Sequence, residues 1–171
     1  MARLELKKWA QVELNNVAFR RDGRIEAQCK LNETQFKDKP AENGMILMVD
    51  KAKNEIVLPN GKDLPYALHY SSEHMYDERA NSLKDFALFP GTFLPRMGYL
   101  AVGDLFTTNC VSSEMDMDAL KAAPTLYGAP SADGSIAITS TKPESDLILK
   151  VVKVYTMPNG EPGLKFQVIK A

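Results

Sequence analysis

Apolar and polar side chains alternate in the first part of the chain. Between residues 3 and 14 the apolar side chains share one parity: Leu4, Leu6, Ala10, Val12 and Leu14. A second alternating run places Ile25, Ala27, Cys29 and Leu31 on one face. A period of two residues predicts β-strands with one buried face. Asp22-Gly23 between the runs is a pair favoured in tight turns, so residues 3–31 are predicted to form a two-stranded antiparallel ribbon.

This ribbon needs a partner, because two strands alone bury too little apolar surface to stay folded in water. It must therefore pack on the rest of the domain or on another chain. The polar stretch from Lys37 to Asn43 carries Pro40 and is typical of a linker. We therefore divide the chain into an extended N-terminal β-ribbon arm, residues 1–36, and a β-rich core domain, residues 37–171. Trp9 breaks the alternation and is placed on the polar face of the arm.

The core domain is predicted to be mainly β. Apolar and β-branched runs between turn residues predict strands at 45–49, 55–58, 66–70, 97–102, 105–111, 136–138, 147–155 and 164–169. Ser113-Glu114-Met115-Asp116 matches a capping box, which predicts a helix of about two turns that ends before Pro124. Residues 72–87 are predicted to form a short helix or an ordered loop. This pattern favours a compact β-barrel or sandwich with one or two short helices.

Composition agrees with a folded, soluble domain. The chain has 171 residues, of which 44% are hydrophobic and 25% charged, and its formal net charge is -1. No run approaches the ~20 apolar residues that span a bilayer, and the N-terminus lacks the apolar core of a signal peptide. We therefore expect synthesis in a cytoplasm and no membrane partner. Cys29 and Cys110 belong to no CxxC pair, so we expect both to be reduced and buried.

The small net charge hides a gradient along the chain. Residues 1–40 carry nine basic and six acidic side chains, whereas residues 101–141 carry five acidic side chains and one lysine. Such a separation can steer self-association or docking on a charged partner, or it can be ordinary solvated surface. Both interpretations stay open.

Motifs for catalysis are not found in the sequence. His69 lies in a predicted strand and is better explained as a half-buried packing residue than as a catalytic base. No serine occupies a G-x-S-x-G elbow, and no glycine-rich phosphate loop precedes a helix. The acids Glu114, Asp116 and Asp118 fit a helix N-terminus better than a metal site. We therefore expect no enzymatic activity, no cofactor and no metal.

Basic and aromatic residues of the arm are candidates for binding a partner. Acids interrupt the basic residues and the chain is not basic overall, so nucleic acid is not an expected partner. The arginines near the predicted turn can instead contact an acidic protein surface, and Trp9 can act as an aromatic anchor. The candidate partner-binding residues are Trp9, Arg20, Arg21 and Arg24.

A family resemblance is carried by residues 93–109, FLPRMGYLAVGDLFTTN, and above all by the step VGDLFTTN at 102–109. This Gly-Asp turn feeding a strand resembles capsid decoration (cement) proteins and minor head proteins of tailed bacteriophages. The resemblance implies a non-enzymatic structural virion protein that binds and stabilises the capsid shell from its surface. It also implies two partners, the major capsid protein and further copies of the chain, often arranged as trimers.

Two other kinds of function stay open. Another virion part, such as a tail or baseplate β protein, would also have a role in assembly. A small enzyme or carbohydrate-binding module could use Trp9 or Tyr99 as an aromatic platform, and it would need convergent polar groups in a pocket.

Overall fold

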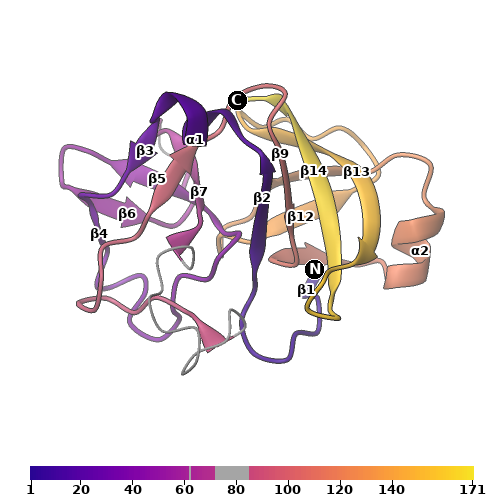
Figure 1. Cartoon of the computed structure of the whole chain (residues 1–171), viewed down its shortest axis with the longest axis horizontal. Helices are drawn as coiled ribbons and strands as arrows, with labels where there is room; N and C mark the ends of the chain where they lie inside the picture. Colours follow the sequence, from indigo (N-terminus) through magenta and orange to yellow (C-terminus); the bar gives the residue numbers. More distant parts are fainter. Residues whose placement is uncertain (62, 72–84) are drawn as a thin grey trace.

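The structure is a computed structural model that describes residues 1–61, 63–71 and 85–171. It is mainly β, with 39% strand and 8% helix, as the sequence predicts. The strands form two mixed sheets that lie side by side along the long axis of the molecule (Figure 1). This arrangement is compatible with a sandwich, and the described strands close no barrel. The helix or loop predicted at 72–87 falls largely outside the described residues.

One sheet has eight strands and contains most of the C-terminal half of the chain. Neighbouring strands are antiparallel except β10 and β12, which are parallel. The order across the sheet is β1 (Ala2–Arg3), β10 (Val111–Ser113), β12 (Ile136–Thr139), β11 (Tyr127–Pro130), β13 (Ile148–Thr156), β14 (Pro162–Lys170), β9 (Leu105–Thr108) and β2 (Val12–Asn16). The strands predicted at 147–155 and 164–169 are therefore confirmed as β13 and β14, which pair as an antiparallel hairpin.

The other sheet has six strands. Its order is β3 (Ile25–Glu26), β8 (Met97–Tyr99), β7 (Tyr66–His69), β5 (Ile46–Asp50), β6 (Glu55–Val57) and β4 (Lys30–Leu31). The strands predicted at 45–49 and 55–58 are confirmed as β5 and β6, which pair antiparallel. The strands predicted at 97–102 and 105–111 form only over their first residues, as β8 and β9, and they enter different sheets. The turn between them, at Ala101–Asp104, therefore joins the two sheets.

The predicted N-terminal ribbon is wrong. β2 pairs with β9, β3 pairs with β8, and a short helix, α1 (Ala18–Asp22), lies between β2 and β3. Gly23 adopts a φ of 72° and ends this helix as a left-handed C-cap, so Asp22-Gly23 forms no hairpin turn. The helix is favoured because it places Phe19 in the core, where its ring packs tightly over the backbone of Gly98.

The segment before β2 also departs from a continuous strand. β1 covers only Ala2–Arg3, and the backbone is irregular from there to β2. Strands from residues 1–36 enter both sheets: β1 and β2 join the eight-stranded sheet, and β3 and β4 join the six-stranded sheet. They pair with strands from the rest of the chain and not with each other. The division of the chain at residue 36 into arm and core stays a prediction, since strand pairing does not measure whether a segment folds independently.

The predicted helix after residue 113 is confirmed as α2 (Met117–Ala122), but its cap is a different residue. Asp116 is the N-cap, and its carboxylate accepts hydrogen bonds from the backbone N–H groups of Asp118 and Ala119. Ser113 instead accepts a hydrogen bond from the backbone N–H of Met115. The helix covers one end of the main core by burying Leu120.

Candidate functional site

Three large apolar side chains are exposed on one loop that enters β8. Phe89 is 43% exposed, Phe93 75% and Leu94 53%. We call residues 89–95 the apolar loop. Most other large apolar side chains that the structure describes are buried or half-buried, so an exposed group of this size marks a candidate interaction surface.

The first four residues of the apolar loop form a tight turn. The backbone N–H and the hydroxyl of Thr92 both donate hydrogen bonds to the carbonyl oxygen of Phe89, at 3.3 and 2.7 Å. Pro90 and Gly91 are the central residues, and Gly91 has a φ of 79°, as a type II turn requires at that position. A second proline, Pro95, stiffens the exit from the loop.

Both ends of the apolar loop are tied to the core. Just before it, Leu88 exchanges two backbone hydrogen bonds with Ala41, each of 2.9 Å. Just after it, the backbone N–H of Arg96 donates to the Ser71 hydroxyl at 2.8 Å, and the Arg96 Nε donates to the Tyr70 hydroxyl at 3.1 Å. The exposed apolar side chains therefore project from a rigid base.

Trp9, the aromatic anchor predicted from the sequence, lies beside this loop. Its ring meets the ring of Phe89 edge to face, with centroids 6.5 Å apart and an interplanar angle of 80°. Next to it, the Lys8 ammonium pairs with the Asp85 carboxylate at 3.2 Å. Trp9 is half-buried rather than fully exposed. The surface formed by Trp9 and the apolar loop is the candidate functional site.

Two buried carboxylates fix the irregular segment that carries Trp9. Glu42, only 3% exposed, accepts hydrogen bonds from the Arg3 guanidinium and, at 2.7 Å, from the backbone N–H of Ala10. Glu161, equally buried, accepts from the backbone N–H of Lys7 at 2.7 Å. Burial alone would lower the pKa of the Arg3 guanidinium. The hydrogen bond to Glu42 and the negative charge of its carboxylate have the larger combined effect, so the pKa is raised.

His69 connects this buried network to the exit of the apolar loop. Its Nδ1 lies 2.9 Å from the Glu42 carbonyl oxygen, and its Nε2 lies 2.7 Å from the Ser71 hydroxyl. A carbonyl can only accept, so Nδ1 carries the proton and Nε2 accepts from Ser71. Complete burial lowers the pKa of His69 to about 4. The imidazole is therefore neutral at pH 7, and it positions Ser71 to receive the Arg96 N–H.

The predicted arginines lie away from Trp9. Trp9 precedes β2, whereas Arg20 and Arg21 in α1, and Arg24 after it, follow the other end of that five-residue strand. Arg21 donates to the Asn16 side chain at 3.2 Å, and Arg24 forms an exposed ion pair with Asp22 at 3.1 Å. The four residues therefore do not converge on one site, and a partner-binding role for the arginines stays a prediction.

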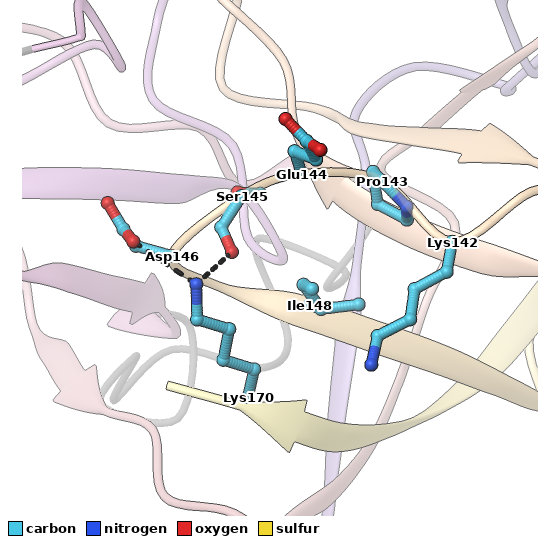
Figure 2. Close-up of a pocket in the computed structure, with 7 residues that line it drawn as sticks. All are labelled: Lys142, Pro143, Glu144, Ser145, Asp146, Ile148 and Lys170. Carbon is cyan, nitrogen blue, oxygen red and sulfur yellow. Dashed lines mark hydrogen bonds and ion pairs between the residues drawn. The ribbon is translucent and has the colours of Figure 1, made fainter.

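A shallow surface depression of about 610 Å³ lies at the start of β13 (Figure 2). Lys170 crosses it, and its ammonium donates to the Ser145 carbonyl oxygen at 2.7 Å and lies 3.3 Å from the Asp146 carboxylate. The loop before β13 therefore already occupies the ammonium of Lys170. It is lined by Lys142, Pro143, Glu144, Ser145, Asp146, Ile148 and Lys170.

Other site chemistry is sparse in the part of the chain that the structure describes. There, no three side chains of the metal-ligating types gather in one place, and no helix has the length and apolar character to cross a membrane. The sequence matches no protein-family model and no curated protein, and the fold matches no solved structure.

Proposed function

We propose that this chain is a non-enzymatic structural virion protein that binds and stabilises a bacteriophage capsid shell. The apolar loop and Trp9 form the surface that contacts the shell. The single observation that carries the proposal is the exposure of Phe89, Phe93 and Leu94 on a loop that begins with a hydrogen-bonded turn and is bonded to the core at both ends. The resemblance of residues 93–109 to capsid decoration proteins gives the class of partner.

Rigid exposed aromatic residues suit a binding surface for physical reasons. Large aromatic side chains account for much of the energy of protein interfaces when they enter pockets on the partner. A loop ordered before binding loses little conformational entropy when it docks, so more of the contact energy appears as affinity. The Thr92 hydrogen bonds and the anchored loop ends provide this order in the isolated chain.

Copy number would make a small contact surface effective. One loop buries little area, but many copies on a symmetric shell bind through linked contacts, which strengthens the whole assembly without new contact types. The partners under this proposal are the major capsid protein and neighbouring copies of the chain. A tail or baseplate role would use the same loop against a different part of the virion.

Mass spectrometry of purified particles tests the proposal. Particles from cells that produce the chain would be separated on a density gradient, and capsids would then be separated from tails. The proposal expects the chain in the capsid fraction at a fixed ratio to the major capsid protein. Its presence in tails alone would support the alternative virion role, and its absence from particles would contradict both.

A further inference from the structure

Three lysines share the outer face of the C-terminal hairpin. In the pairing of β13 with β14, Lys150 lies opposite Gln167 and Lys153 lies opposite Lys165. A bulge at Val152 shifts the register between them, so Lys150 and Lys153 point to the same side of the sheet. On β14, Leu164 and Phe166 flank Lys165 and are completely buried, so they face the core. Because side chains alternate along a strand, Lys165 and the lysines opposite it lie on the outer face.

Glu13 lies on the same face of the sheet as these lysines, but its carboxylate accepts a hydrogen bond from the Tyr155 hydroxyl and forms no ion pair with a described lysine. No described carboxylate lies within ion-pair distance of Lys150, Lys153 or Lys165. Lys153 and Lys165 are direct cross-strand neighbours, and like charges in that position destabilise a sheet. The Lys153 ammonium lies 5.3 Å from the centre of the Tyr155 ring, which attracts it but does not cancel its charge.

In the part of the chain that the structure describes, the edge of β13 is paired at Lys150 but open at Lys153. β11 pairs with β13 only at Lys150 and Leu149, and the last backbone bond on that side is from Val151 N–H to the Leu126 carbonyl. Beyond it no described strand pairs with this edge of β13. The chain before β11 turns away toward α2 and leaves a groove of about 310 Å³ lined by Leu120, Ala123, Pro124, Leu126 and the edge residues 151–154.

We propose that this groove and edge bind an extended acidic segment of a partner protein. The segment adds one strand to the edge of β13 beyond Val151, places apolar side chains against Leu126 and Val152, and directs carboxylates to the lysine face at Lys153 and Lys165. A row of unpaired backbone groups fits a peptide and not a phosphate chain, which favours protein over nucleic acid. A second copy fits poorly, because its β13 edge would bring lysines against lysines.

This surface is separate from the apolar loop. α2 lies at the end of the long axis opposite the six-stranded sheet, and the apolar loop leads into that sheet (Figure 1). The inference therefore does not depend on the proposed function. If both hold, one molecule contacts two protein surfaces from its two ends.

A capped ten-residue peptide that alternates valine and glutamate is the probe, with binding to the full chain measured by calorimetry. We expect saturable binding, at least tenfold weaker for Lys153→Glu and Lys165→Glu, and unchanged for Phe93→Ser. Lys53→Glu is the matched control, because it makes the same charge change on an exposed lysine of the β5–β6 loop. A peptide N-methylated on alternate residues cannot pair with an edge and should not bind.

Lys165→Glu separates a binding role from a structural one. Replacing a like-charge pair by an opposite pair should raise the Tm by about 1–3 °C while it weakens peptide binding at least tenfold. Several results would overturn the proposal: no saturation at about 1 mM peptide, equal binding by the N-methylated peptide, or unchanged binding by the two lysine variants. Equal binding of a single-stranded DNA of the same charge would also overturn it, as would a dimer that competes with the peptide.

Discussion

Arg3 donates hydrogen bonds to Glu42, a residue 39 positions further along the chain, and closes over a carboxylate that is nearly inaccessible to water. The Nη2 group of Arg3 lies 3.1 Å from Oε2 of Glu42. The same Oε2 receives the backbone N–H of Ala10, so one carboxylate holds two points of the N-terminal segment. Trp9 is adjacent to Ala10, and its position beside the apolar loop therefore depends on Glu42.

Glu42→Gln should destabilise the protein by about 2 kcal/mol. It removes the negative charge that pairs with Arg3, and it places an amide NH2 group, which can only donate, where a carboxylate oxygen accepted hydrogen bonds from Arg3 or Ala10. Urea unfolding at pH 7 measures this change. Lys8→Ala is the control, since its pair with Asp85 is exposed and should contribute less than about 1 kcal/mol. Equal losses for the two variants would show that the Glu42 network does not fix the N-terminal segment.

Stability should decrease as the pH falls from about 6.5 to about 4, because of His69. Its pKa is lowered to about 4 in the folded chain by burial, whereas it is about 6.5 in an unfolded chain. Between these values only the unfolded state binds the proton, so acid favours unfolding, by about 3 kcal/mol at most. Chemical unfolding at several pH values should show this slope.

His69→Gln is the matched variant for the pH series. This variant should be less stable at pH 7, because the hydrogen bonds that join His69 to the Glu42 carbonyl oxygen and the Ser71 hydroxyl are altered. Its free energy of unfolding should also depend less on pH between about 4 and 6.5, because glutamine does not titrate. A slope identical to that of the wild type would assign the pH dependence to other groups and contradict the burial of a neutral imidazole.

Both cysteines are free and completely buried, as the sequence predicts. Burial raises the pKa of the Cys110 thiol to about 12, so the reactive thiolate is scarce at pH 8. A thiol reagent should therefore label neither cysteine in the native protein and both after denaturation without reductant. Intact mass shows the count, and fewer than two labels on the denatured chain would indicate a disulfide or prior oxidation.

The sequence predicted most strands but not which strands pair. Runs such as Ile46–Asp50 and Ile148–Thr156 are visible locally because β-branched and apolar residues cluster between turns. The partner of a strand can lie far away in the sequence. We expected the first two runs to pair with each other because they are consecutive, but β2 pairs with β9 and β3 pairs with β8. Asp22-Gly23 was ambiguous for the same reason, since glycine with a positive φ suits both a hairpin turn and a helix C-cap. The buried environment of Phe19 decided between them.

The candidate site was only partly visible from the sequence. Trp9 was recognisable because it interrupts the alternating pattern. Phe93 and Leu94 were not, because an apolar residue between turns looks the same whether the fold buries it or leaves it exposed. The Pro90-Gly91 turn and Pro95 were the available signal, since they indicate a rigid loop around those residues.

Particle occupancy of loop variants tests most directly whether the apolar loop binds the capsid shell. Phe93→Ser with Leu94→Ser should leave the unfolding free energy within about 0.5 kcal/mol of the wild type, since both side chains are exposed. Val102→Ser is the control, because Val102 is equally exposed but lies outside the loop. We predict that the wild type and Val102→Ser co-sediment with assembled capsids and that the loop variant stays unbound. Full occupancy by the folded loop variant, or no wild-type chain on capsids, would contradict the account.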